Sequence, residues 1–227
     1  MTILAIVPAR AGSKGVKNKN KRLVGGRPLI EWTLQACENI DDLDVAVSTD
    51  DKAILEIAKK YNVIAHERDA SIAGDTTPMN DVIYDALVSV SAMTGKKYEK
   101  VMLLQPTAPM RRRSHVEEAI QLARSISCDS VMSVYKVTDC HPARMYTLAD
   151  SSLIPYASEP KGSLRQDLPD VYHRNGAIYL SNVKTFMSTR SIWGGDVAAY
   201  TMEKSDSVNI DDEDDLKIAD FLLSNRK

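Results

Sequence analysis

Short apolar segments typical of buried strands alternate with segments of helical spacing along most of this chain. Strands are expected at 2–7, 43–48, 63–66, 101–105, 130–137, 177–181 and 197–202. Helices are expected at about 29–36, after the capping residues 49–51, and at about 78–94, 113–126 and 212–223. This alternation predicts an α/β fold, in which a mostly parallel sheet is covered by helices on both faces. Ligands of such folds bind above the carboxyl ends of the strands.

Residues 138–172 interrupt the alternation with polar sequence. The interrupting residues are Pro142, Pro155, Pro160, Gly162 and Pro169. Because proline and glycine break regular structure, we interpret this segment as an inserted arm. A length of 227 residues suits one large domain better than two. We therefore expect a single domain over 1–227 that carries the arm.

Three features of the composition exclude broad classes of protein. No apolar run approaches the roughly 18–20 residues that span a membrane, and the start lacks the basic region of a secretion signal. Cys37, Cys128 and Cys140 are odd in number and widely spaced, which argues against a disulfide framework or a structural zinc site. The net charge of −2 argues against a general nucleic-acid binder. We expect a cytoplasmic protein with neither a membrane nor a nucleic acid as partner.

Charge is strongly segregated along the chain. Residues 1–30 contain Lys and Arg but no acidic residue, whereas residues 206–215 contain five Asp and one Glu but no base. A positive pole suits a polyanionic ligand, and an acidic pole suits a cation. Two solvated charged segments would give the same pattern. The choice between binding sites and solvated segments therefore depends on the motifs within them.

The loop after the first strand has the composition of a phosphate-binding loop. Gly12 and Gly15 permit backbone conformations in which successive amide groups converge on an anion. Arg10 and Lys14 add positive charge to the same loop. Its spacing matches neither the P-loop nor the dinucleotide-binding fingerprint. The run 16–21 adds further lysines, which in most loops are simply solvated.

Five blocks of sequence then follow one another in a recognisable order. They are Pro8–Gly15 with Lys19 and Asn20, Ser48–Asp51, Arg68–Thr76, Leu103–Arg111, and Arg165–Pro169 leading to Asn175–Tyr179. Together these blocks cover most of the chain, and they resemble the acylneuraminate cytidylyltransferases, also called CMP-sialic acid synthetases. The resemblance implies a Rossmann-like three-layer αβα nucleotidyltransferase fold with a dimerisation arm. It also implies an enzyme that transfers CMP from CTP to the anomeric hydroxyl of an acidic nine-carbon sugar, a nonulosonic acid, and releases pyrophosphate.

The resemblance also implies roles for individual residues. The nucleotide would be held by Arg10, Ser13, Lys14, Asn20, Arg68 and Thr77. Lys19 would lie next to the reacting phosphate, so that the residues expected to carry catalysis are Lys19, Arg10 and Asp211. The sugar would contact Gln105, Arg165 and Tyr179, with Arg165 reaching across a homodimer interface to the substrate carboxylate. Arg144 is a second candidate for the carboxylate, and for both arginines a surface ion pair is the alternative.

The acidic segment 207–216 precedes an expected helix, where acids also cap the first turn and favour the helix dipole. In the family that the chain resembles, this segment reads Asp-Ile-Asp, and both carboxylates hold magnesium. Here the first position is Asn209 and the second is Asp211, which share one side of an extended strand. We expect Asp211 to bind Mg²⁺, and Asn209 to bind through its carbonyl oxygen or through water. Whether one or two ions bind stays open.

A reaction of this kind depends on positioning and charge neutralisation rather than on a covalent nucleophile. We accordingly interpret Cys37 as a packing residue, and His173 either as structural or as a residue at the edge of the site. A cytidylyltransferase for 3-deoxy-manno-octulosonic acid is an alternative, against which the block at 165–179 argues. A nucleotide-sensing module without turnover is a second alternative, which Asn209 keeps open. No motif distinguishes N-acetylneuraminic, legionaminic and pseudaminic acids as acceptors.

Overall fold

The structure is a computed structural model that describes residues 1–12, 15–74, 76–159 and 164–226, without the side chains of Ala70 and Arg165. Its centre is a seven-stranded sheet in the order β11-β7-β10-β6-β1-β4-β5. These strands are β1 Ile3–Pro8, β4 Leu43–Thr49, β5 Ile64–Glu67, β6 Lys100–Leu103, β7 Ser130–Lys136, β10 Tyr172–Asn182 and β11 Val197–Thr201. Neighbouring strands are parallel except where β10 pairs with β6 and β7. The mostly parallel sheet expected from the sequence is confirmed.

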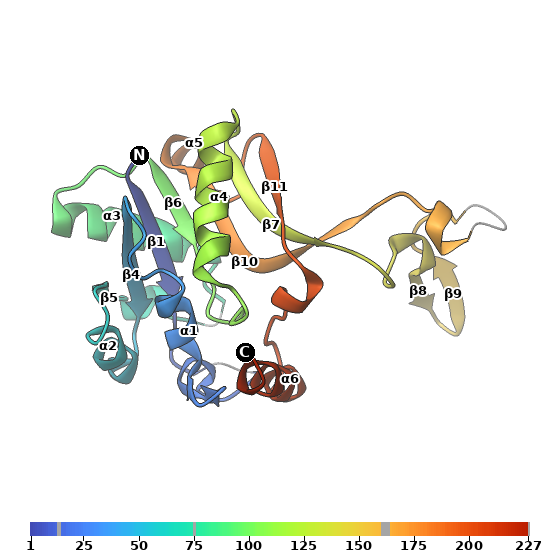
Figure 1. The fold of residues 1–227 in the computed structure, drawn as a ribbon, viewed down its shortest axis with the longest axis horizontal. Helices are drawn as coiled ribbons and strands as arrows, with labels where there is room; N and C mark the ends of the chain where they lie inside the picture. Colours follow the sequence, from blue (N-terminus) through green and yellow to red (C-terminus); the bar gives the residue numbers. More distant parts are fainter. Residues whose placement is uncertain (13–14, 75, 160–163, 227) are drawn as a thin grey trace.

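Helices cover both faces of this sheet (Figure 1). They are α1 Leu29–Gln35, α2 Lys52–Ala58, α3 Met79–Thr94, α4 Arg113–Ser125, α5 Val183–Thr189 and α6 Glu213–Ser224. Along β1, Ile3, Ala5 and Val7 pack in one cluster with α1, α2 and α4, whereas Leu4 and Ile6 pack in another with α3 and α5. Successive side chains of a strand point to opposite faces, so the sheet is the middle layer of three. The αβα layering is therefore confirmed.

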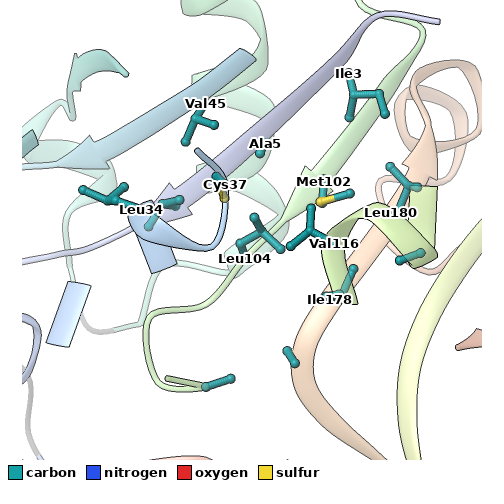
Figure 2. Close-up of a cluster of buried hydrophobic side chains, with 14 of the residues drawn as sticks. Ile3, Ala5, Leu34, Cys37, Val45, Met102, Leu104, Val116, Ile178 and Leu180 are labelled. Carbon is teal, nitrogen blue, oxygen red and sulfur yellow. The ribbon is translucent and has the colours of Figure 1, made fainter. Parts of the chain in front are cut away.

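Figure 2 shows part of the cluster on the Ile3 face, in which Cys37 lies near Leu34, Val45 and Leu104. The Cys37 side chain is buried, and burial raises the pKa of its thiol to about 12. A neutral, buried thiol behaves as a small apolar side chain. The interpretation of Cys37 as a packing residue is confirmed.

A third cluster joins α6 to the segment that follows the first strand. Val16, Leu29, Ile210 and Leu216 are among its buried members, and the short strand β2 Leu23–Val24 packs between β3 Arg27–Pro28 and α6. This packing brings the acidic segment at the start of α6 next to the basic loop at the start of the chain. The two charged poles of the sequence are thus neighbours in space.

The arm leaves the body of the molecule between β7 and β10 (Figure 1). It carries a hairpin of β8 Tyr146–Ala149 and β9 Ser152–Pro155, with short 3₁₀ turns at Pro142–Arg144 and Arg165–Asp167. Its large apolar side chains include the exposed Leu148, Leu153 and Ile154. The hairpin was not predicted, because its strands are too short and too close to prolines to show a clear period.

None of the helices in the described part of the chain has the length and apolar composition needed to cross a membrane.

Candidate active site

Two adjoining cavities lie at the carboxyl ends of β1 and β6, the edge of the sheet at which ligands were expected. The smaller, of about 240 Å³, is lined by Pro8, Arg10, Gly15, Lys19, Asn20, Arg68, Met79, Gln105, Pro106 and Thr107. The larger, of about 580 Å³, is lined by Met79, Leu103, Gln105, Tyr135, His173, Arg174, Asn175, Gly176, Tyr179, Trp193, Ser207, Asn209 and Asp211. Met79 and Gln105 belong to both linings, so the two cavities form one divided site. The smaller cavity holds most of the cations, and the larger holds most of the aromatic rings.

The basic loop is fixed to the sheet on one side of the smaller cavity. The hydroxyl of Thr49 donates to the carbonyl of Ala9, and the amide of Ala11 donates to Oδ1 of Asp50 at 2.7 Å. Asn20 completes the attachment, since its side-chain nitrogen donates to the carbonyl of Arg10 at 3.4 Å. These bonds place Arg10 and Asn20 at the rim of the cavity beside β1. Ser13 and Lys14, which the sequence also assigned to the nucleotide, lie outside the described residues.

Gly15 lies against the acidic segment on the other side of the loop. A Cβ atom at this position would overlap the backbone carbonyl oxygen of Asp211. Only glycine therefore permits this approach without a shift of the backbone. The sequence pointed to Gly15 for its conformational freedom, but the structure indicates that the absent side chain matters more.

Lys19 connects the basic loop to the acidic segment. It begins the 3₁₀ turn η1, Lys19–Lys21, and its ammonium donates to the carbonyl of Ile210 at 2.6 Å and to that of Asp211 at 3.4 Å. Burial lowers the pKa of Lys19, although the carboxylates of Asp211, Asp215 and Asp212 oppose the shift. The resulting cation is largely desolvated, and charges in such surroundings act more strongly on a neighbouring phosphate than they do in water.

Arg68 also lines the smaller cavity. It is 5% exposed, and its guanidinium donates to the Ser48 hydroxyl at 3.2 Å and to the Ser48 carbonyl at 2.9 Å. The same hydroxyl lies 3.2 Å from Nδ1 of His66, whose Nε2 lies 3.3 Å from the carboxylate of Asp85. Burial lowers the pKa of His66, while Asp85 raises it. A neutral His66 in this network helps to fix the position of Arg68.

The acidic segment presents one carboxylate and one amide to the larger cavity. Asn209 donates through its side-chain nitrogen to Oδ2 of Asp211 at 2.8 Å, and the backbone amide of Asp211 donates to Asp215 at 2.9 Å. Asp212 caps α6, because its carboxylate accepts from the amides of Asp214 and Asp215. Asp212 and Asp215 therefore cap the helix and Asp214 pairs with Lys217 within it, as the alternative interpretation of the cluster predicted, whereas Glu213 pairs with Arg22. Of the segment 207–216, Ser207, Asn209 and Asp211 line the larger cavity, and Asp211 is the acid among them.

Aromatic side chains form the outer wall of the larger cavity. The rings of Tyr179 and Trp193 lie 5.5 Å apart, and the guanidinium of Arg174 lies 5.1 Å from the centre of the Trp193 ring. On the other side, the rings of Tyr135 and His173 lie 5.4 Å apart. His173 is thus a residue at the edge of the site rather than part of the core. Such a wall suits a ligand that presents carbon–hydrogen surfaces together with polar groups.

The structure brings some of the expected sugar-binding residues together and keeps others apart. Gln105 and Tyr179 line the larger cavity. Arg144 lies on the arm, where its Nε is 3.0 Å from the carboxylate of Glu159, and it lines neither cavity. Arg165 starts the second 3₁₀ turn of the arm, and its side chain is not among those that the structure describes. Thr77, which was assigned to the nucleotide, also lines neither cavity.

Several residues of the larger cavity were not predicted, among them Arg174, Trp193, Tyr135 and Met79. Arg174 stands beside the block that ends at Tyr179, so its position next to Asn175 was a usable signal. Trp193 and Tyr135 come from a loop and from β7, and no motif marked them. Their contribution depends on how distant segments meet, which the sequence pattern does not reveal.

Comparisons with known proteins show the family to which the chain belongs. The family model described as cytidylyltransferase matches residues 4–194. The N-acylneuraminate cytidylyltransferase of Streptococcus agalactiae serotype V is 33% identical over 95% of this chain and 52% of its own length. The CMP-N,N'-diacetyllegionaminic acid synthase of Legionella pneumophila is 30% identical over 98% of this chain and 97% of its own length. The chain thus spans about half the length of the streptococcal relative but nearly all of the Legionella one.

Solved structures show the same fold at lower identity. A CMP:2-keto-3-deoxy-manno-octonic acid synthetase complexed with CTP superposes with a TM-score of 0.71 at 16% identity, and the match covers 100% of both chains. A 4-diphosphocytidyl-2C-methyl-D-erythritol synthase from Anaerococcus prevotii gives a TM-score of 0.70 at 16% identity and covers 99% of both chains. At this identity the likeness concerns the fold alone, whereas the match over residues 4–194 concerns the family. This chain belongs to the cytidylyltransferase family.

Proposed function

We propose that this protein transfers CMP from CTP to the anomeric hydroxyl of a nonulosonic acid and releases pyrophosphate. The observation that carries the proposal is the divided site, in which a cavity rich in cations adjoins a larger cavity walled by aromatic rings. The names of the relatives in Streptococcus agalactiae and Legionella pneumophila support an acidic nine-carbon sugar as the acceptor.

The smaller cavity would take the nucleotide. Arg10, Lys19 and Arg68 line it and would offset the negative charge of a triphosphate. When the sugar hydroxyl attacks the α-phosphorus, the bond to pyrophosphate breaks, and negative charge builds up on the phosphate oxygens. Fixed cations in a partly desolvated cavity stabilise that charge without having to reorganise. Lys19, bonded to the acidic segment between the two cavities, is the residue best placed for this role.

The larger cavity would take the sugar. Gln105 lies in both linings, so it can contact a sugar whose hydroxyl points toward the nucleotide. Tyr179 and Trp193 offer ring faces to the carbon skeleton, and Arg174 offers a cation to an acidic group. Holding the two substrates side by side removes much of the entropic barrier to their reaction.

We further propose that Mg²⁺ is the cofactor, held by the side-chain oxygens of Asp211 and Asn209. Oxygen ligands are those that Mg²⁺ prefers, and it keeps several waters and phosphate oxygens as further ligands. No cluster of three or more His, Cys, Asp or Glu suited to a metal occurs among the described residues. With two protein side chains as ligands, the ion would take its remaining ligands from the triphosphate and from water. When bound, the ion would supply neutralisation of phosphate charge.

The protein is proposed to work as a cytoplasmic homodimer, with the arm reaching the partner's site. The exposed Leu148, Leu153 and Ile154 give the arm an apolar surface that a second copy could cover. Arg165 and Arg144 stand on this arm and would then approach the partner's larger cavity. Both would present a cation to the carboxylate of the sugar.

The test is a panel assay with purified protein, CTP, Mg²⁺ and N-acetylneuraminic, legionaminic, pseudaminic and 3-deoxy-manno-octulosonic acids, read by the mass of the CMP-sugar. We expect CMP transfer to at least one of the three nonulosonic acids. Transfer only to 3-deoxy-manno-octulosonic acid would contradict the proposed acceptor class. Binding of CTP without product from any acid would indicate a nucleotide-sensing module instead.

A further inference from the structure

Arg111 is a buried arginine beneath the floor of the divided site. It is 2% exposed and lies near the end of the loop that leads from β6 to α4. Its Nη1 donates to the carbonyl of Ala177 at 2.6 Å and to that of Gln105 at 3.2 Å, and its Nη2 donates to the hydroxyl of Thr33 and to the carbonyl of Gln105 at 3.3 Å. One guanidinium thus joins the loop after β6, strand β10 and helix α1.

The charge of Arg111 has no counter-ion within the described ranges of the chain. None of the ion pairs found there involves it, and its buried Nε has no hydrogen-bond partner among the described residues. Cys37 is the titratable neighbour, but burial raises the pKa of its thiol to about 12, so the thiol stays neutral. Burial lowers the pKa of Arg111 to about 10. An unpaired buried cation lowers the stability of the folded state. We therefore expect Arg111 to have a role beyond packing.

The position of Arg111 coincides with the point at which β6 and β10 separate. The ladder between these strands pairs Leu103 with Tyr179 as its last residues toward the site. Continued in the same register, Gln105 would lie opposite Ala177. The guanidinium instead occupies the space between these two residues and bonds to both of their carbonyls. It bridges the two strand ends where a direct ladder would otherwise continue, next to the irregularity of β10 between Arg174 and Tyr179.

The separated strand ends carry the groups that line the site. Gln105 belongs to both cavities, and Gly176 precedes Ala177 in a backbone conformation with φ +73°. A Cβ atom on Gly176 would lie 3.1 Å from Oε1 of Gln105 and 3.7 Å from Oδ1 of Asn209. The distance that Arg111 sets between Gln105 and Ala177 therefore also sets how Gln105, Gly176 and Asn209 meet.

We propose that Arg111 is a positioning residue, which wedges β6 from β10 and so places Gln105 at the boundary between the nucleotide and acceptor cavities. The effect on the acceptor rests on the proposed function, whereas the effect on the two strand ends does not. Loss of the wedge leaves the described residues of the basic loop in place, because none of the four hydrogen bonds of Arg111 goes to them. The acceptor side should therefore suffer more than the nucleotide side.

The test compares the parent with Arg111→Met, Arg111→Lys and the matched control Lys100→Met. Lys100 is also buried and also joins the same two strands, since its Nζ donates to Oδ1 of Asn182 at 2.7 Å. It stands at the amino end of β6, away from both cavities. Methionine removes the charge and the donors in each case while keeping a long, flexible side chain.

Hydrogen–deuterium exchange gives a readout that needs no turnover. Arg111→Met should raise exchange in peptides that cover 104–109 and 175–178, and Lys100→Met should leave those peptides unchanged.

In kinetics with the best acceptor, kcat/KM for the acceptor should fall at least about tenfold in Arg111→Met, as expected when a positioning contact is lost. Binding of CTP should change less than about twofold, because its cavity keeps its cations. Arg111→Lys should have a kcat/KM for the acceptor between those of the parent and Arg111→Met. An ammonium keeps the charge but lacks the planar guanidinium that spans both carbonyls.

Parent-like exchange at both strand ends in Arg111→Met would overturn the proposal. An equal loss of activity per folded molecule in Arg111→Met and Lys100→Met would also overturn it. If Arg111→Met does not fold, Arg111→Lys carries the test, and unchanged exchange with an unchanged KM for the acceptor would overturn it. A parent that forms no CMP-sugar would contradict the proposed function, and exchange at the strand ends would still decide the role of Arg111.

Discussion

The ammonium nitrogen of Lys19 lies 2.6 Å from the carbonyl oxygen of Ile210, although the two residues are 191 positions apart in the chain. This bond joins the basic loop that follows β1 to the acidic segment that precedes α6. It holds a buried cation of the smaller cavity beside Asp211, which lines the larger cavity. The relationship makes Lys19 the first residue to test.

Lys19→Ala is expected to lower kcat by about a hundredfold or more, with a much smaller change in the affinity for CTP. The reason is that a fixed cation near the α-phosphate matters most as charge develops in the transition state. Steady-state kinetics and calorimetric titration with CTP would separate the two effects. Lys17→Ala, at an exposed position of the same loop, is the control and should retain activity. A parent-like kcat in Lys19→Ala would remove Lys19 from the site.

Asp211→Asn is expected to abolish most activity, and added Mg²⁺ should restore it only in part. A neutral amide attracts the cation less than a carboxylate does. Asn209→Asp should have the opposite effect and lower the Mg²⁺ concentration that gives half-maximal rate. Asp214→Asn is the control, because Asp214 pairs with Lys217 on the exposed face of α6. Identical Mg²⁺ titrations for all these variants would locate the metal elsewhere.

Gly15→Ala is expected to reduce activity strongly, because the added methyl group would overlap the carbonyl oxygen of Asp211. The basic loop would have to move away from the acidic segment and carry Lys19 with it. Gly74→Ala is the control, since a Cβ there would lie at an ordinary 3.6 Å from the hydroxyl of Thr77. Equal rates for the two variants would show that the loop accommodates the methyl group without moving the site.

Stability is expected to fall as the pH drops below the ordinary His66 pKa of 6.5, because burial holds the pKa of His66 below that value in the folded state. The unfolded chain then binds more protons than the folded one, so acid favours unfolding. His115 is shifted in the same direction by burial and should add to the effect. Urea unfolding at about pH 7.5 and about pH 5.5 would measure it. His66→Gln should lose less stability between these two conditions than the parent; an equal loss would exclude His66 as a contributor.

A mixed dimer tests whether the arm serves the partner's site. Arg165→Ala and Lys19→Ala chains, each nearly inactive alone, are combined into a purified heterodimer. If Arg165 acts in the partner's site, one site carries both changes and the other carries neither, so about half of the sites regain activity. If Arg165 acts in its own chain, every site keeps one change.

The same mixture also has a clear negative outcome. An inactive heterodimer, or a monomeric parent at assay concentrations, would contradict the shared site. The arm would then be a cover over its own chain. Two Lys19→Ala chains bearing different tags provide the control for subunit exchange, since their dimer should stay inactive.

Much of the layered fold was readable from the sequence, because strand and helix periods are local properties of side-chain order. The segments at 2–7 and 43–48 became β1 and β4 with ends shifted by only a residue or so, and Asp51 caps α2 as expected. The motif blocks likewise pointed to Arg10, Lys19 and Asn20, which the structure brings together at one cavity. Helix α5 was missed because Phe186 is its one buried residue, so its sequence shows no apolar face. The hairpin of the arm was missed because its strands are too short to show a period.

By itself, the sequence determined the alternation of elements, the basic and acidic poles, and the family-like blocks, since each of these depends on residues that are close in the chain. Only the tertiary structure decided that β10 runs antiparallel between β6 and β7, that Trp193 and Tyr135 wall one cavity, and that Lys19 reaches Ile210. It also decided that Arg111 separates two strand ends. These outcomes depend on the order of the strands and on close packing between distant segments, and a pattern of neighbouring residues carries no information about either.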